Sequence, residues 1–277
     1  MKSLFYTLLT FVAAVSIVAV LAACGDEESV AEASEMPIAK TRTELPKCNA
    51  SREGQVRPVE EDEVSFRCEN GEWIYHVASD KRRDRGSAYD PATGTLTDLR
   101  DNQTYRTVKI GDQVWMAENL RFRQYVRTEL TPCYEDKEEN CDKYGRLYSV
   151  NISTQCPKGW HLPDSTEFRA LFNIAEEKQH PFLKALAATD GWDDYNGRSM
   201  NGTDDLGFSL LPGGYMCKDS TGAAQYKEIG VGTMLDSGEL GFFSDGLTMF
   251  VVVARYGSAD MVIQDSGCYA YVRCVMD

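Results

Sequence analysis

The sequence has few of the side chains that most enzymes use for acid–base or metal chemistry. Histidine occurs only three times in 277 residues, as His76, His161 and His180, and the three are isolated from one another. The HExxH and paired CxxC spacings of zinc sites are absent, as are the P-loop, the GxGxxG fingerprint and the GxSxG elbow. No local catalytic or nucleotide-binding motif is therefore present, although a triad built from distant residues would not be visible in the sequence.

Clustered basic residues are also lacking. The formal net charge is −14 at pH 7, and the longest basic run, Lys81–Arg85, is interrupted by Asp84. Proteins that bind nucleic acid need clustered Lys and Arg to displace counterions from phosphates. The composition therefore argues against a nucleic acid partner, and the basic run is interpreted as part of a solvated linker.

The longest stretch without charge lies at the N-terminus, between Lys2 and Cys24. About twenty apolar residues can span a bilayer, but small residues at the end of the run favour a removable signal peptide. Leu21–Cys24 resembles the bacterial lipobox, in which the cysteine is acylated and becomes the new N-terminus. We therefore expect a signal peptide over residues 1–23, lipid attachment at Cys24, and an outer-membrane anchor.

The residues after Cys24 bear on the orientation of the protein. Gly25–Glu28 is acidic and resembles the export signal of surface lipoproteins, so we expect exposure at the cell surface. A domain that faces the periplasm is the alternative. Residues 24–46 are small, acidic and without periodicity, which predicts a flexible tether.

Cysteine usage fits an exported chain. Nine cysteines are present, and eight remain once Cys24 is set aside. An even number in an oxidising compartment predicts four disulfides, but eight cysteines alone leave many pairings open.

A small β module is predicted over residues 47–78. Its Asn70–Gly71 pair is typical of a two-residue hairpin turn. A module of about 30 residues cannot bury a sufficient core, so a Cys48–Cys68 disulfide is the expected staple. Residues 79–103 are polar and are predicted to be a linker, and the main domain is assigned to residues 104–277.

Two acidic segments offer oxygen ligands of the kind that calcium prefers. The first, between Cys133 and Cys141, lacks EF-hand spacing and is interpreted as a loop closed by a Cys133–Cys141 disulfide. In the second, Asp190–Phe208, Asp and Asn are also favoured for local hydrogen bonds in turns. No metal site is predicted; the residues to examine for calcium are Asp193, Asp194, Asn196, Asp204 and Asp205.

The sequence predicts one helix of the main domain from its capping residues and its apolar pattern. Asp164 precedes an apolar stripe that starts at Phe168, and Glu167 completes a capping box. Trp160 and His161, just before it, have no evident role, and we expect both to be buried. Strand-like runs lie before and after the helical segments, which predicts an α+β domain whose outer strands meet in one sheet.

Five ordered segments of the main domain resemble one family. They are "YRTVKIGDQVWMAENL" (105–120), "CYEDKEENCDKYGRLYSV" (133–150), "CPKGWHLPDSTEFRALF" (156–172), "GTDDLGFSLLPGGYM" (202–216) and "YVRCVMD" (271–277). Together they resemble the FISUMP domain, the major paralogous domain of Fibrobacter. That family is similar to C-type-lectin-like and formylglycine-generating-enzyme-like folds, which implies two helices beside a mixed, mainly antiparallel sheet.

The resemblance also implies a Cys156–Cys274 disulfide, which leaves Cys217–Cys268 as the fourth pair. The chain departs from the family at Gly241–Gly246, where "GFFSDG" replaces a block similar to Phe-Trp-Ser-Ser. The calcium-binding motifs of sugar-binding C-type lectins are absent, so calcium-dependent sugar binding is not implied.

These observations predict a lipid-anchored surface protein that needs no cofactor and binds an extracellular polysaccharide or an envelope partner without catalysis. One alternative is an oxidase that resembles the formylglycine-generating enzymes and uses Cys268 and Cys274 as a reactive pair. A second alternative is a purely structural envelope protein. The segments to examine for a concave, aromatic-lined site are residues 190–205 and 213–246.

Overall fold

The structure is a computed structural model that describes residues 38–61, 63–126, 129–149, 155–178, 182–243, 246–255, 258–265 and 267–277. The predicted signal peptide, Cys24 and most of the predicted tether lie outside the described residues. Ile38–Asp277 form one compact unit. Within the described ranges, every helix is too short or too polar to cross a membrane.

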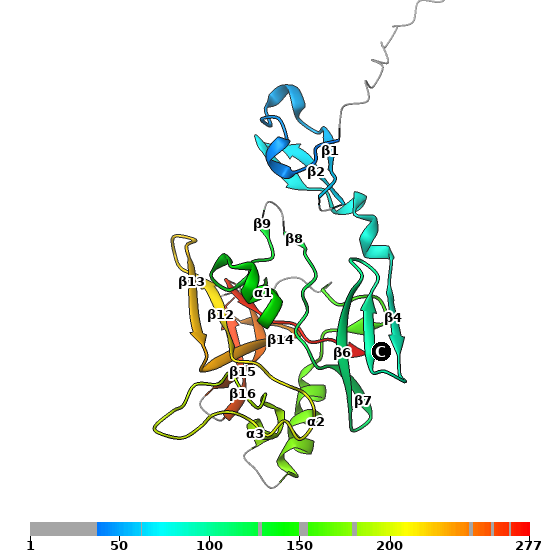
Figure 1. Cartoon of the computed structure of the whole chain (residues 1–277). Coiled ribbons are helices and arrows are strands. Elements are labelled where there is room, and N and C mark those ends of the chain that lie inside the picture. Colours follow the sequence, from blue (N-terminus) through cyan, green and yellow to red (C-terminus); the bar gives the residue numbers. More distant parts are fainter. Residues whose placement is uncertain are drawn as a thin grey trace, which may run out of the picture. The chain divides into compact units, whose positions relative to one another are not determined.

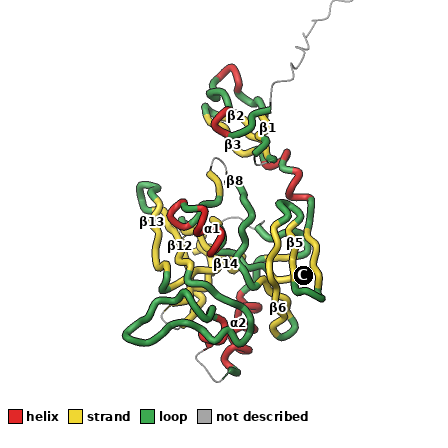
Figure 2. Tube along the Cα trace, viewed as in Figure 1, coloured by secondary structure: helices red, strands yellow, loops and turns green. Residues whose placement is uncertain are grey.

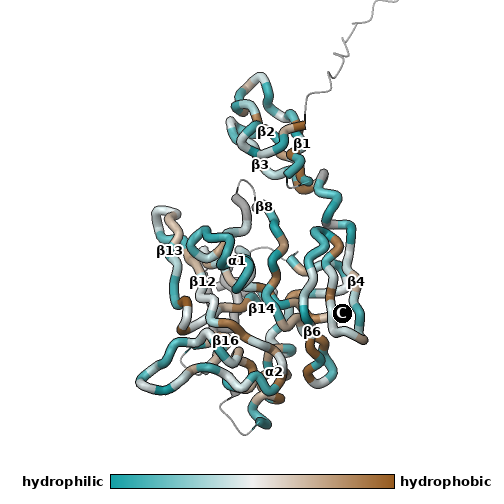
Figure 3. The backbone as a smooth tube through the Cα atoms, in the orientation of Figure 1, coloured by the Kyte–Doolittle hydropathy of each residue, from teal (hydrophilic) through white to brown (hydrophobic). Residues whose placement is uncertain are grey.

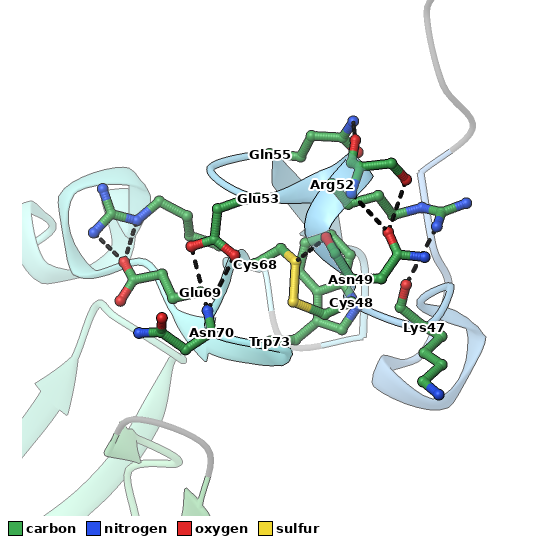
Figure 4. Close-up of a disulfide and its surroundings, with 12 residues drawn as sticks. Lys47, Cys48, Asn49, Arg52, Glu53, Gln55, Cys68, Glu69, Asn70 and Trp73 are labelled. Carbon is green, nitrogen blue, oxygen red and sulfur yellow. Dashed lines mark hydrogen bonds and ion pairs between the residues drawn. A yellow bond between two sulfur atoms is a disulfide. The ribbon is translucent and has the colours of Figure 1, made fainter.

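The small module is a three-stranded antiparallel sheet in the order β1-β2-β3 (Figure 1). Its elements are η1 (Arg42–Glu44), η2 (Ala50–Arg52), β1 (Val56–Val59), β2 (Val64–Glu69) and β3 (Glu72–Tyr75). The predicted hairpin is confirmed as β2–β3, with Cys68 opposite Trp73. Figure 4 shows the predicted Cys48–Cys68 disulfide joining the segment before η2 to β2.

The tether prediction is wrong for residues 38–46, which are held against this module. Ala39 pairs with Val59 in a parallel bridge, and its carbonyl accepts a hydrogen bond from Glu60 N at 2.8 Å. The indole N–H of Trp73 donates to Pro46 O at 2.5 Å. These contacts depend on strands that are distant in sequence, so the local composition did not reveal them.

The linker prediction is wrong for most of residues 79–103. After η3 (Val77–Ser79) and η4 (Lys81–Asp84), β4 (Ser87–Asp90) and β5 (Thr95–Asp98) form a hairpin that pairs with β6 (Gln103–Ile110). Leu96 and Asp98 are buried on β5. Arg82 of the basic run is buried too, with its Nε 3.0 Å from Asp80 Oδ1. The segment therefore contains two strands and a buried ion pair, in place of the predicted solvated linker.

The main domain contains a six-stranded sheet in the order β11-β18-β7-β6-β5-β4. Besides β4 and β5 it consists of β6 (Gln103–Ile110), β7 (Gln113–Met116), β11 (Trp160–His161) and β18 (Val275–Met276). The last strand, β18, lies between β7 and β11, with Val275 opposite Trp115. The prediction that the outer strands of the domain meet in one sheet is confirmed.

A seven-stranded sheet follows the order β10-β17-β12-β14-β15-β16, with β13 paired to β12 off this path. Its strands are β10 (Tyr148–Ser149), β12 (Gly213–Lys218), β13 (Ala224–Ile229), β14 (Gly232–Phe243), β15 (Gly246–Arg255), β16 (Ser258–Asp265) and β17 (Cys268–Ala270). All pairs are antiparallel except β12 with β14, so the sheet is mixed and mainly antiparallel. A short pair, β8 (Tyr125–Val126) and β9 (Glu129–Leu130), stands apart.

Helices are short and few beside these strands (Figure 2). They are η5 (Tyr134–Asp136), α1 (Glu138–Tyr144), α2 (Ser165–Glu176) and α3 (Phe182–Leu186). The predicted capping box of α2 is confirmed, because Asp164 Oδ1 accepts from Glu167 N at 2.8 Å and Glu167 Oε2 accepts from Asp164 N at 2.9 Å. Helix α1 was not predicted; it begins inside the loop that the Cys133–Cys141 disulfide closes and continues past Cys141 to Tyr144.

All four predicted disulfides are present. Cys156–Cys274 joins the approach to β11 to the residue before β18, so it ties together segments 118 residues apart. Next to it, Arg273 is fully buried and donates to Asn119 Oδ1 and to the carbonyls of Phe208 and Ser209. The main domain therefore has the predicted α+β class, and its distant segments are held together by a long-range disulfide and a buried guanidinium.

Candidate binding site

The calcium candidates do not converge on one point. Asp204 accepts hydrogen bonds from Ser209 N at 2.7 Å and from Ser209 Oγ at 2.6 Å, so its carboxylate is used within its own turn. The loop that carries the candidates is hydrophilic and has little regular structure (Figure 3). Among the described residues, the one cluster of acidic, thiol and imidazole groups close enough to share a metal ion is Cys133, Glu138 and Cys141. Its two sulfurs form a disulfide, so it offers no thiolates.

The proposed oxidase pair does not meet as two thiols. Cys268 is bonded to Cys217, and Cys274 is bonded to Cys156. Both residues are buried. A reactive pair would need free thiols facing each other, and each of these sulfurs has a different covalent partner.

His161 is not buried, in contrast to Trp160; its side chain is 42% exposed. Its Nδ1 lies 2.8 Å from Asp277 Oδ1, and its Nε2 lies 3.0 Å from Glu167 Oε1. Burial lowers the pKa of His161, but the hydrogen bonds to these two carboxylates outweigh burial and raise it. A ring with both nitrogens occupied by carboxylates ties β11 to α2, and it has no nitrogen left for a substrate.

An aromatic row crosses three neighbouring strands of the seven-stranded sheet. Met216 of β12 lies opposite Tyr226 of β13 on one side and opposite Tyr269 of β17 on the other. Side chains of directly paired residues point to the same face of a sheet. The order across the face is therefore tyrosine, methionine, tyrosine, and we refer to these three residues as the aromatic row.

The aromatic row forms the floor of a groove with a volume of about 280 Å³. Lys218 and Ala224, the next pair along the same face, also line it. Pro132 and Asp136, from the segment between β9 and α1, supply a wall. The groove therefore combines ring faces and a thioether with one cationic and one anionic side chain at its margin.

The tyrosine on β13 is positioned by that wall. The ring of Tyr226 lies 5.1 Å from the ring of Tyr134, centroid to centroid. Burial raises the pKa of Tyr226, and its side-chain hydrogen bond to Asp136 adds to the effect, so the phenol stays protonated and donates to that carboxylate. A side chain at Gly214, whose φ is +71°, would collide with the ring of Tyr134. Glycine at this position of β12 therefore lets the wall pack closely against the sheet.

The Tyr269 side of the aromatic row is held by a disulfide on the opposite face of the sheet. Cys217 and Cys268 are directly paired on β12 and β17, with Cα atoms 4.0 Å apart, and their disulfide joins the two strands. Each is a chain neighbour of a groove residue, so it points to the opposite face. Lys218 Nζ lies 5.6 Å from the centroid of Tyr269. The disulfide thus locks the register that places Tyr269 beside Met216.

The groove suits recognition of a ligand with apolar faces and polar edges. Aromatic rings offer a large, rigid contact area, and a few charged groups at the margin fix orientation. Most of its lining residues lie in the predicted segment 213–246, whereas Pro132, Asp136 and Tyr269 lie outside it. Residues 190–205, the other predicted segment, contribute no lining residue to this groove.

Comparisons with known proteins agree with the sequence resemblance. Neither curated proteins nor solved structures gave a match. The family model described as Fibrobacter succinogenes major domain matches residues 108–276, which is more than half of the chain. This protein therefore belongs to the Fibrobacter succinogenes major domain family.

Proposed function

We propose that the protein is a lipid-anchored outer-membrane protein, exposed at the cell surface, whose main domain binds an extracellular polysaccharide without catalysis. The lipobox-like Leu21–Cys24 and the acidic residues after it support the anchor and its orientation. We further propose a C-type-lectin-like fold for the main domain, supported by outer strands that meet in one sheet and by a mixed sheet with short helices. Fold resemblance alone does not identify a ligand, so the ligand class rests on the groove.

The groove carries the proposal. A sugar ring has an apolar face of C–H groups and a rim of hydroxyls, so it can stack on a tyrosine while its rim reaches polar side chains. Tyr226 and Tyr269 supply such faces, and Asp136 and Lys218 supply an acceptor and a donor at the margin. Glycoside hydrolysis ordinarily uses two carboxylic acids, and Asp136 is the one acidic residue among the described residues that line the groove, which fits binding rather than turnover.

Anchoring is tested at Cys24. We expect Cys24→Ser to prevent acylation, so that the protein moves from the membrane fraction to the aqueous phase in detergent partition, because the durable anchor is the lipid. Mass spectrometry of the mature N-terminus measures the modification. Unchanged partition of the serine variant would show that something other than a lipid on Cys24 holds the protein.

Binding is tested by replacing one tyrosine of the groove. We expect Tyr269→Ala to weaken polysaccharide binding by the full chain about tenfold, since an aromatic contact contributes roughly 1 kcal/mol beyond its buried area. Affinity electrophoresis with a panel of soluble polysaccharides measures this. Tyr195→Ala, at an exposed loop position, is the matched control and should bind as the wild type does.

The same panel separates the alternatives. Binding to envelope proteins with no binding to any polysaccharide would replace the proposed ligand class. No binding at all would favour a purely structural protein. Titration of the folded chain for thiols addresses the oxidase alternative, which needs two free thiols at Cys268 and Cys274, where the structure has disulfides to two other cysteines.

A further inference from the structure

The aromatic row has a fixed length that bears on the size of its ligand. Tyr226 and Tyr269 occupy strands on either side of β12, and adjacent strands are about 4.8 Å apart, so the two side chains start about 10 Å apart across the sheet. A single sugar ring is too small to lie over both. Both tyrosines line the same groove, so a longer chain can contact them together.

The spacing is held on both sides of β12. On one side, the Cys217–Cys268 disulfide prevents β17 from sliding along β12. On the other, β13 pairs with β12 from Gly213↔Ile229 to Lys218↔Ala224. The groove is therefore organised before a ligand arrives, and a ligand that matches it pays little for ordering the site.

The centre of the row differs from its ends. Met216 is 3% exposed, whereas Tyr226 and Tyr269 are each only partly buried. A flexible thioether between two rings tolerates different groups above it. Met216 can therefore lie under a sugar unit that is turned over relative to its neighbours, while the two tyrosines prefer flat apolar faces.

We propose, building on the proposed function, that the groove binds an extended, equatorially linked sugar chain. The chain runs across β13, β12 and β17, with alternate sugar units stacked on Tyr226 and Tyr269. In such a chain each unit is turned over relative to its neighbour, so alternate units present the same face. Three consecutive units are the shortest piece that covers the aromatic row. A chain with axial linkages curves away from a flat row, so it is the wrong shape for both rings.

Titration calorimetry of the full chain with β-1,4-linked glucose oligomers of increasing length tests the proposal. We expect affinity to rise at least tenfold from the disaccharide to the trisaccharide, with little further gain for the tetrasaccharide. The α-1,4-linked trisaccharide of the same sugar is the control ligand and should bind no better than a disaccharide. Equal affinities for the two linkages, or affinity independent of length, would overturn the proposal while leaving polysaccharide binding intact.

Variants connect this length dependence to the row. We expect Tyr226→Ala to reduce trisaccharide affinity to that of the disaccharide, and Tyr226→Phe to retain the gain, because stacking needs the ring and not the hydroxyl. The phenylalanine variant also shows whether loss of the hydrogen bond to Asp136 damages the fold. If no glucose oligomer binds at any length while a polysaccharide with axial linkages does, the stated linkage class is wrong; if no saccharide binds, the proposed function itself fails.

Discussion

Replacing Cys156 and Cys274 together by alanine is expected to lower the free energy of unfolding by about 5 kcal/mol. The disulfide closes a loop between residues 118 apart, and the chain-entropy model assigns a bridge of this length about that value. Cys274 is fully buried beside Val275 of β18, the strand that joins β7 to β11. Since small domains are stable by about 5–15 kcal/mol, the variant should lose a large part of its stability. Guanidinium unfolding monitored by tryptophan fluorescence measures the change.

The Cys133–Cys141 disulfide provides the comparison. Its sequence separation is 8, and the same model gives about 2.5 kcal/mol for so short a loop. Alanine replacements at this pair should therefore cost about half as much as those at Cys156 and Cys274. Equal losses in the two double variants would show that loop closure is not the main contribution of the long-range bridge.

Much of the scaffold could be predicted because its signals are local. The Asn70–Gly71 turn and the Asp164–Glu167 capping box each depend on residues a few positions apart, and both are present. Strands β4 and β5 were missed because they are only four residues long and Asp98 interrupts the apolar pattern. Asp98 is buried against Arg100, with 2.7 Å between Oδ2 and Nη2, and a sequence does not show which charges are paired.

The groove could not be predicted in the same way. Its three central residues come from strands that end at residues 218, 229 and 270, so their alignment depends on strand register. A register shift of one residue would turn each tyrosine to the other face of the sheet. The usable signal was indirect: the expected Cys217–Cys268 disulfide places Met216 and Tyr269, their chain neighbours, close together. In the acidic loop, Asp204 accepts a hydrogen bond within its own turn, as the local interpretation of its Asp and Asn residues predicted.

A buried carboxyl group gives the second large expected effect. Asp236 of β14 is 1% exposed, and within the described part of the chain its Oδ2 has no hydrogen-bond partner. Its other oxygen accepts from Gly238 N at 3.1 Å, at a register shift between β14 and β15. Burial raises the pKa of Asp236 to about 7, and the hydrogen bonds from Gly238, Gln155 and Ser237 offset only part of that rise.

The sign of the pH dependence follows from the raised pKa. Between about pH 4 and pH 7 the folded state keeps a proton on Asp236 that the unfolded state has released, so stability falls as pH rises through this window. Above it both states are ionised, and the folded state carries the whole cost of a buried charge, about 4 kcal/mol for a shift of this size. Asparagine has nearly the same shape and no charge at any of these pH values.

We therefore expect Asp236→Asn to raise the free energy of unfolding by about 4 kcal/mol at pH 8 and to leave it nearly unchanged at pH 4. Denaturant unfolding at a series of pH values measures both limits. Asp219→Asn is the matched control with the opposite sign, because hydrogen bonds from Thr221 and Ala223 lower the pKa of that exposed carboxyl. Ionisation of Asp219 stabilises the folded state, so replacing it by asparagine should lower the free energy of unfolding slightly at pH 8. A loss of stability in Asp236→Asn at pH 8 would contradict the cost assigned to the buried carboxylate.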